Sequence, residues 1–209
     1  MLSFAGAAIL GYAVGSIPTG VLVSRLRAGT DIRKHGSGSP GATNVSRLLG
    51  WQAGLAVAAL DAAKGFLAVR FAAIAGLGAP DDPTLPLVAG FFAALGHVWP
   101  AFAGFRGGKA VATSSGALLA VAPAALLAAA SVFAVVLAAR RIVSLASLAA
   151  AIALPPVLLA VRWTGAWSVS AALIVYAFLT AALVLFTHRS NVGRLRAGTE
   201  PTLDPRRDP

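Results

Sequence analysis

The chain contains no cysteine, and only seven of its 209 residues are acidic. The lack of cysteine excludes disulfide bonds, thiolate nucleophiles and metal sites with cysteine ligands. Charged residues make up 11% of the chain, whereas about 25% is usual in a soluble domain. Hydrophobic residues reach 58%, and the mean hydropathy is +0.81. These values exclude an ordinary soluble domain and indicate an integral membrane protein.

Strand patterns and long internal repeats are also absent from the sequence. Aromatic residues make up only 8%, while glycine and alanine are abundant, as expected where helices in lipid approach each other closely. The start, MLSFAGAAILGYAVGS, has no basic segment before its apolar run, so we expect a first span and not a cleaved signal. We predict one all-α, membrane-embedded domain over residues 1–209, with a partly flexible tail at 198–209.

Helices that cross a bilayer need about 20 apolar residues, because the hydrocarbon layer is about 30 Å thick and each residue rises about 1.5 Å. Five stretches fit this length: 3–24, 52–76, 86–105, 144–161 and 166–187. A sixth stretch, 110–139, would be about 45 Å long as one helix, too long for a single crossing. Pro123 interrupts it, because proline removes a backbone donor and disfavours helix in the residue before it. We predict two short helices, 110–121 and 124–139, and seven transmembrane helical segments in all.

The net charge of +10 is concentrated in four places: 25–47, 106–109, 140–141 and 189–207. The loop around Asp81 and Asp82 has no lysine or arginine. This alternation follows the positive-inside rule and predicts an N-terminus outside and a C-terminus in the cytoplasm. It also argues against a nucleic-acid partner. Several arginines need no role beyond topology or lipid headgroup contact: Arg25, Arg27, Arg140, Arg206 and Arg207.

Four polar stretches fall on the same predicted face: TDIRKHGSGSPGATNVSR, GFRGGKAVATSS, RRIVSLAS and HRSNVGRLRAGTE. Glycines let backbone N–H groups converge on an anion, and a following helix N-terminus adds partial positive charge. Lysine and arginine supply the counter-charge, arginine through a two-pronged fork. These stretches therefore predict phosphate binding, and Lys109, between paired glycines and a helix start, is the strongest candidate.

Soluble nucleotide-binding motifs do not explain the glycines. Gly36, Gly38 and Gly41 match G-x-G-x-x-G, but no strand precedes them and Asp61 falls inside an apolar span. A P-loop is excluded because Ala103 and Ala110 replace its first glycine and its Ser or Thr.

Charged and histidine side chains inside the apolar stretches have a simpler reading. Asp61 and Lys64 lie three apart on one helix face, so we expect them to pair and reduce the cost of burying charge. We expect His97 to be a packed, hydrogen-bonded histidine. The chain's other histidines, His35 and His188, show no metal-ligand spacing with it, so no metal site is predicted.

Together these motifs resemble one family, the bacterial acyl-phosphate-dependent glycerol-3-phosphate acyltransferases of the PlsY type. The resemblance rests on GSGSPGATNVSR, GFRGGKAVAT and HRSNVGRLRAGTE, and on the lesser features GSIPTG, DAAKG, GHVWPAFAGF and RRIVSLASL. It runs from Gly15 to Glu200 in order and spacing. The chain departs from the family at Ser39, where asparagine is usual, and at Ala110, where glycine is usual. We expect Ser39 still to donate to an oxygen and Ala110 to need only ordinary helical torsions.

The resemblance implies transfer of a fatty acyl group from acyl phosphate to the 1-hydroxyl of sn-glycerol 3-phosphate. The products would be lysophosphatidate and inorganic phosphate, in the first step of phospholipid synthesis. The resemblance further implies a seven-helix fold, no cofactor and no metal, and a multi-pass protein of the bacterial inner membrane with its active site facing the cytoplasm. The expected partners are the two substrates and membrane lipid. Oligomeric state stays open, with a monomer as the simplest expectation.

By the family's pattern, six residues line the catalytic pocket: Ser37, Arg47, Lys109, Ser144, His188 and Asn191. A second set is expected to bind the substrates' phosphate and polar groups or to brace the pocket: Gly36, Gly38, Thr43, Asn44, Gly107, Gly108, Arg194 and Glu200. Lys109 and Arg47 would stabilise negative charge on the leaving phosphate. Ser37, Ser144 and Asn191 would orient glycerol phosphate and the acyl carbonyl.

No Ser-His-Asp triad can be assembled, and H-x-x-x-x-D is absent, so a covalent serine intermediate is not expected. Either His188 or a substrate phosphate oxygen could accept the hydroxyl proton, and we favour the phosphate. A transporter for a phosphorylated solute is the main rival, although its polar groups would lie at mid-membrane and often in inverted repeats. A structural lipid-binding protein is the third reading.

Overall fold

A computed structural model describes residues 2–75 and 83–203. Asp81, Asp82 and the tail from residue 204 onward, including Arg206 and Arg207, lie outside the described residues. The chain divides into two compact units, Met1–Val121 and Ala122–Pro209, each of which is described by itself. All regular structure in the described residues is helical, as the sequence predicts.

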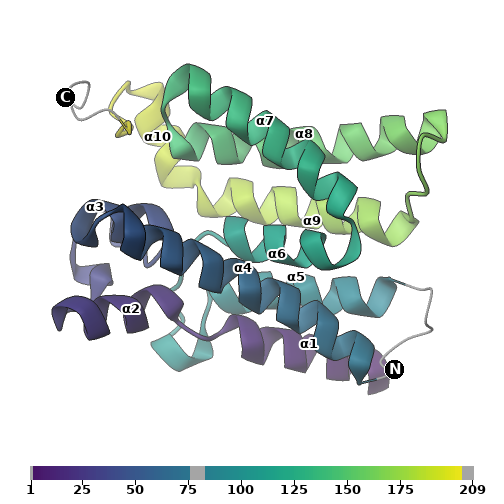
Figure 1. The fold of residues 1–209 in the computed structure, drawn as a ribbon, viewed down its shortest axis with the longest axis horizontal. Coiled ribbons are helices and arrows are strands. Elements are labelled where there is room, and N and C mark those ends of the chain that lie inside the picture. Colours follow the sequence, from purple (N-terminus) through teal and green to yellow (C-terminus); the bar gives the residue numbers. More distant parts are fainter. Residues whose placement is uncertain (1, 76–82, 204–209) are drawn as a thin grey trace. The chain divides into compact units, whose positions relative to one another are not determined.

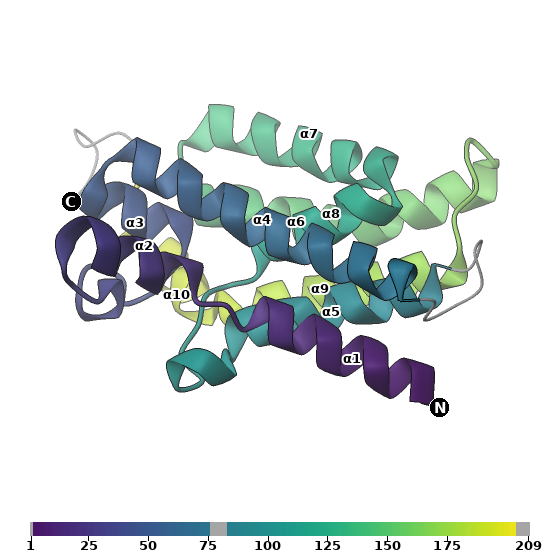
Figure 2. The ribbon, with the colours of Figure 1, turned by 60° about the horizontal axis from the view of Figure 1, so that its bottom comes forward.

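The first unit contains six α-helices and two short 3₁₀ turns (Figure 1). Their bounds are α1 (Leu2–Gly15), α2 (Thr19–Ala28), η1 (Ile32–Lys34), α3 (Ala42–Leu49), α4 (Trp51–Ile74), α5 (Thr84–Val98), η2 (Ala101–Ala103) and α6 (Val111–Val121). Helix α1 packs against α5, and α4 packs against α6. Helices α2 and α3 contact each other at one end of the unit, where the polar loops also lie (Figure 2).

Small residues allow these helices to approach closely. A Cβ added at Gly15 would overlap the carbonyl of Ala93, and one added at Gly65 would overlap the carbonyl of Thr113. Without a hydrophobic force between helices in lipid, van der Waals packing of this kind holds them together. The abundance of glycine and alanine therefore serves the α1–α5 and α4–α6 contacts.

The second unit contains α7 (Pro123–Arg140), α8 (Val143–Thr164), α9 (Ala171–Thr187) and α10 (Arg189–Arg196). Helix α8 packs against both α7 and α9. It stays helical through Pro155 and Pro156. In α7 only Ala125 is buried, and Leu127 and Val135 are each 68% exposed. An exposed face this apolar is suited to lipid.

Four helical stretches of the described residues are long and apolar enough to cross a membrane: 3–28, 84–103, 123–140 and 143–164. A fifth is gained if α9 and α10, which meet at 61°, count as one bent span. Helix α4 has 24 residues but carries Asp61, Lys64 and Arg70, and it is not among them. The chain is thus a helical membrane protein, while the seven-segment topology remains a prediction.

The predicted break at Pro123 is confirmed. Helix α6 ends at Val121, Ala122 is non-helical, and Pro123 is the first residue of α7. The span expected over 3–24 is confirmed as one apolar stretch, 3–28, but it is not one continuous helix, because the chain leaves α1 after Gly15 and re-enters helix at Thr19. Pro18 provides the reason, since it lacks an N–H and disfavours helix in Ile17. Helices α3 and α10 lie in stretches that the sequence analysis treated as polar loops.

Candidate active site

The first polar loop, residues 35–41, follows the η1 turn in the first unit and precedes α3. Gly36 and Gly38 have φ values of +56° and +71°, in the left-handed region that glycine enters without steric cost. A Cβ on Gly36 would also overlap the side-chain oxygen of Asn44. The two glycines are therefore needed for the shape of this loop.

Asn44, in the first turn of α3, holds the loop in place. Its Oδ1 accepts a hydrogen bond from the Ser37 amide at 3.1 Å, and its Nδ2 donates to the carbonyls of His35 and Ser39, each at 3.0 Å. The side chain is only 4% exposed. Its amide is thus used within the loop, which favours bracing over direct substrate contact. The Ser37 side chain is exposed, and Thr43 is half-buried.

The second polar loop, residues 104–110, joins η2 to α6. Gly107 donates its amide hydrogen to the carbonyl of Val98 and Gly108 donates to that of His97, both at 3.0 Å. The amides of Gly107 and Gly108 therefore donate to carbonyls of the same unit and do not point at a bound anion. The loop carries two cations: Arg106, which is exposed, and Lys109, which is half-buried two residues before α6.

Ala110 corrects one expectation from the sequence. Its φ is +63°, so it does not have ordinary helical torsions. It precedes α6, and its carbonyl accepts the first hydrogen bond of that helix, from the Ser114 amide at 2.8 Å. The loop must reverse direction here to enter the helix. A glycine, usual at this position in the family that the sequence resembles, would take this conformation without strain.

Arg33 connects the two loops, and the sequence analysis did not single it out for this role. Its Nη1 donates to the carbonyls of Ala103 at 2.6 Å and Arg106 at 3.3 Å, while its Nη2 lies 2.7 Å from Asp31 Oδ2. Hydrogen bonds from Arg33 hold the pKa of the Asp31 carboxyl well below its usual range. Arg47, the remaining cation expected here, is exposed in the last turn of α3.

In the second unit, Glu200 gathers three of the predicted residues. Its Oε1 accepts from Ser144 Oγ at 2.7 Å and from Asn191 Nδ2 at 2.5 Å, and its Oε2 accepts from Arg194 Nε at 2.7 Å. Burial alone would raise the pKa of Glu200, but these hydrogen bonds outweigh it and lower the pKa. Glu200 therefore positions Ser144 and Asn191 as an ionised carboxylate.

His188 lies at the junction of α9 and α10 and is 2% exposed. Its Nδ1 lies 2.8 Å from the carbonyl oxygen of Val184. A carbonyl oxygen only accepts, so Nδ1 carries the hydrogen and a neutral ring would have its acceptor at Nε2. The guanidinium of Arg189 lies 4.7 Å from the centre of the Phe186 ring.

A buried polar cluster, Thr19, Asp61, Lys64 and His97, lies beside the second loop. The predicted pairing of Asp61 with Lys64 is confirmed, with 2.9 Å between Oδ1 and Nζ. Thr19 Oγ1 donates to the same Oδ1 at 2.5 Å, and His97 Nδ1 lies 3.3 Å from it. The expectation of a packed histidine is thus also confirmed. The contacts of Thr19 and His97 with Asp61 were not foreseen, although both residues lie in motifs of the resemblance, GSIPTG and GHVWPAFAGF.

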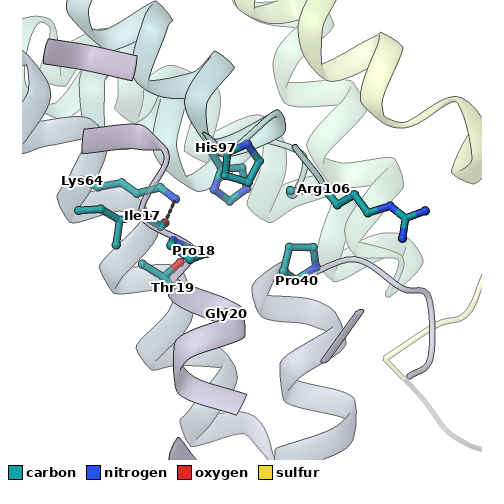
Figure 3. A pocket seen from close by; sticks show the side chains of 10 residues that line it. Ile17, Pro18, Thr19, Gly20, Pro40, Lys64, His97 and Arg106 are labelled. Atoms are coloured by element: carbon teal, nitrogen blue, oxygen red, sulfur yellow. Dashed lines mark hydrogen bonds between the residues drawn. The ribbon is translucent and has the colours of Figure 1, made fainter. Parts of the chain in front are cut away.

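A small pocket opens next to this cluster (Figure 3). Lys64 points its ammonium at the carbonyl of Ile17, 3.0 Å away, and Arg106 extends its guanidinium away from His97. The pocket is lined by Ile17, Pro18, Thr19, Gly20, Pro40, Lys64, His97, Pro100, Arg106 and Gly107. Across residues 2–75 and 83–203, no group of three or more His, Asp or Glu side chains could hold a metal ion.

The predicted site residues thus form two groups, each organised within its own unit. In the first unit, the two loops carry Gly36, Ser37, Gly108 and Lys109, and α3 carries Asn44. The second unit holds Ser144, Asn191, Arg194 and Glu200 together around one carboxylate, with His188 three residues before Asn191. A single pocket formed by both groups remains a prediction.

Comparison with known proteins gives consistent matches over nearly the whole chain. The family model for glycerol-3-phosphate acyltransferase matches residues 5–198. A glycerol-3-phosphate acyltransferase of Chlorobaculum parvum is 40% identical over 227 residues, covering 97% of each chain. One from Geobacillus kaustophilus is 44% identical over 193 residues, covering 92% of each.

Two solved structures have the same fold. Both are crystal structures of PlsY (YgiH), an integral membrane glycerol 3-phosphate acyltransferase. The glycerol 3-phosphate form has a TM-score of 0.85 and 35% identity, covering 97% of this chain and 96% of that one. The lysophosphatidic acid form has a TM-score of 0.82 and 34% identity with the same coverage.

Proposed function

Because the chain belongs to the glycerol-3-phosphate acyltransferase family and is an acyltransferase, we propose that its donor is acyl phosphate and its acceptor the 1-hydroxyl of sn-glycerol 3-phosphate. The bond between the acyl carbon and the phosphate oxygen breaks, and an ester bond forms to the 1-oxygen. The hydroxyl proton leaves with phosphate, so the products are lysophosphatidate and inorganic phosphate. The PlsY structures in their glycerol 3-phosphate and lysophosphatidic acid forms support this assignment.

The observation that carries the proposal is the pair of braced polar loops that precede α3 and α6. Arg33 joins them, Asn44 fixes the first, and the half-buried Lys109 belongs to the second. Both substrates carry a phosphate and need a cation, and the donor also needs apolar helices beside that cation to receive its acyl chain. Lys109 and Arg47 bind phosphate and stabilise the charge that develops as the mixed anhydride opens.

The residues around Glu200 supply orientation. Ser144 and Asn191 each have a hydrogen bond fixed by the same carboxylate oxygen, so their remaining polar atoms are held in defined directions. Acyl phosphate is already an activated donor, and correct placement of the hydroxyl supplies much of the acceleration. No covalent enzyme intermediate is required.

A phosphate oxygen of the substrate accepts the hydroxyl proton in this mechanism, and His188 acts by polar contact. A His188→Ala variant is then expected to retain measurable turnover. Loss of activity below detection, with glycerol 3-phosphate still bound, would instead assign the proton to His188. Binding is measured separately by titration calorimetry.

The membrane arrangement belongs to the same proposal. Seven helical segments, with the N-terminus outside, put every basic cluster and both groups of predicted site residues at the cytoplasmic face of a bacterial inner membrane. The distribution of lysine and arginine supports this arrangement. Glycerol 3-phosphate, which cannot cross lipid unaided, would then be taken from the cytoplasm.

Purified protein in detergent tests the function directly. Mixed with acyl phosphate and glycerol 3-phosphate, it is expected to release inorganic phosphate and lysophosphatidate in equal amounts, and to release neither with acyl-CoA as donor. Lys109→Ala is expected to lose at least about 100-fold in turnover, comparable to removing one preorganised charge-stabilising group. If the wild-type protein makes neither product but carries glycerol 3-phosphate into vesicles, the chain is a transporter.

A further inference from the structure

The buried cluster of Thr19, Asp61, Lys64 and His97 has no role in the mechanism above. All four residues are at most 7% exposed. Asp61 Oδ1 receives Thr19, Lys64 and His97, and Lys64 also donates to the carbonyl of Ile17. Replacing a buried ion pair by apolar residues is often neutral or stabilising, so stability alone is a weak reason for such a cluster. What the cluster contacts is therefore more informative than its pairing.

His97 connects the cluster to the second polar loop through two separate contacts. Its carbonyl accepts the amide hydrogen of Gly108 at 3.0 Å. Its ring packs against Gly108 so closely that a Cβ there would overlap Nε2. Asp61 holds the opposite side of the ring at Nδ1. The imidazole is thus clamped between a fixed carboxylate and the backbone just before Lys109.

The pocket of Figure 3 borders the second polar loop, and Lys64, His97, Arg106 and Gly107 are among its lining residues. The hydrogen bonds of Gly107 and Gly108 to Val98 and His97 hold the loop to the end of α5 beside this pocket. A small rotation of the His97 ring would shift Gly108 and, with it, the start of the Lys109 side chain.

We propose that His97 is a positioning residue for Lys109, with Asp61 fixing the ring and the ring fixing the backbone at Gly108. Thr19 and Lys64 hold Asp61 in place. The inference rests on the proposed function, because Lys109 is the phosphate-binding cation in that mechanism. His97 itself does not touch substrate.

Two glycine variants form a matched pair that tests the ring contact. In Gly108→Ala the methyl overlaps the side chain of His97, whereas in Gly107→Ala it overlaps the carbonyl oxygen of His97. Shortening the side chain with His97→Asn relieves the first overlap and leaves the second. Asparagine can still donate to Asp61 from near the Nδ1 position. Each single variant is expected to lose about tenfold or more in kcat/KM, since a 1 Å misplacement can cost about 100-fold.

The double variants decide the matter. Gly108→Ala with His97→Asn is expected to exceed Gly108→Ala alone in kcat/KM, while Gly107→Ala with His97→Asn is expected to show no recovery. Non-additivity of this kind arises only between residues that interact. Additive losses in both pairs would overturn the proposal. If Gly108→Ala does not accumulate as folded protein, recovery of folded yield by His97→Asn is scored in the same way.

A second readout does not depend on turnover. An amine-reactive reagent modifies Lys109 at a rate that mass spectrometry can follow. Relative to wild type, this rate is expected to change more in His97→Gln, which loses the Asp61 contact, than in His97→Asn. An equal rate in wild type and both variants would overturn the positioning role. If wild-type protein makes no lysophosphatidate while these rates still differ, the proposed function fails and the positioning role stands.

Discussion

At the scale of single residues, Ala110 is the clearest case of a conformation that the sequence does not encode locally. Alanine is the best helix former, and the next residue begins α6, so local propensity predicts helical torsions. The positive φ arises because the loop from Gly104 must turn into the helix at this point. Loop closure, and not the residue's own preference, sets this angle.

Ala110→Gly is therefore expected to stabilise the protein by about 1 kcal/mol, because the left-handed conformation costs a non-glycine residue roughly 1–2 kcal/mol. The gain is reduced by the greater freedom of glycine in the unfolded chain. The measurement is Tm in detergent. Ala117→Gly, buried inside α6, is the matched control and is expected to lower Tm. A fall in Tm for both variants would contradict the account.

Glu200 gives a residue-scale prediction about pH. Its pKa is lowered in the folded protein, so the stabilisation it provides is complete above the ordinary carboxyl pKa of about 4.3 and is lost as pH falls through the folded value. Glu200→Gln cannot be protonated in this range and also presents an amide to Arg194. The variant is expected to have a lower Tm near neutral pH and a smaller fall in Tm between about pH 5 and about pH 3. An unchanged fall would mean that other carboxyls account for the acid sensitivity.

At the scale of elements, helix length and punctuation were largely readable from the sequence. Pro123 ends one helix and begins the next as predicted, and apolar stretches gave α4 to α9 approximately. The helix break at Pro18 was not predicted, because apolar residues continue on both sides of this proline and were counted as one span. The short helices α3 and α10 were missed because their residues are polar, and each belongs to a motif that was read for its chemistry.

The contact between the two loops is also beyond sequence patterns, since Arg33 and Ala103 are far apart in the chain. Arg33→Lys is expected to weaken it, because one ammonium cannot reproduce the fork that meets Asp31 and two carbonyls together. We expect the free energy of unfolding to fall by about 1–3 kcal/mol, a loss typical of hydrogen bonds to charged groups. The measurement is Tm. Arg25→Lys is the control, since Arg25 reaches Asp31 only at 3.6 Å from a 61% exposed side chain. Equal effects of the two variants would contradict a specific role for the Arg33 fork.

At the scale of the whole molecule, contacts near in sequence were predicted and distant ones were not. Asp61 and Lys64 lie three apart, so helix geometry alone predicts their pairing. Thr19 is 42 residues from Asp61, and no local pattern connects them. The group around Glu200 joins α8, α10 and the tail, and it was identified through the resemblance, not through spacing. Residue types therefore indicated the phosphate chemistry, while the long-range contacts that hold the site residues in place are seen only in the structure.

Membrane orientation is the remaining property at this scale, and the absence of cysteine makes it directly testable. Single cysteines at four exposed positions, Ser3, Lys34, Trp163 and Arg196, would each be the chain's only thiol. The positive-inside rule predicts that a membrane-impermeant maleimide labels Ser3→Cys and Trp163→Cys from outside intact cells. Lys34→Cys and Arg196→Cys are expected to react only after the membrane is opened. Since Lys34 adjoins the first loop and Arg196 lies in α10, labelling of these two from opposite sides would separate Lys109 from His188 and remove the basis for a shared site.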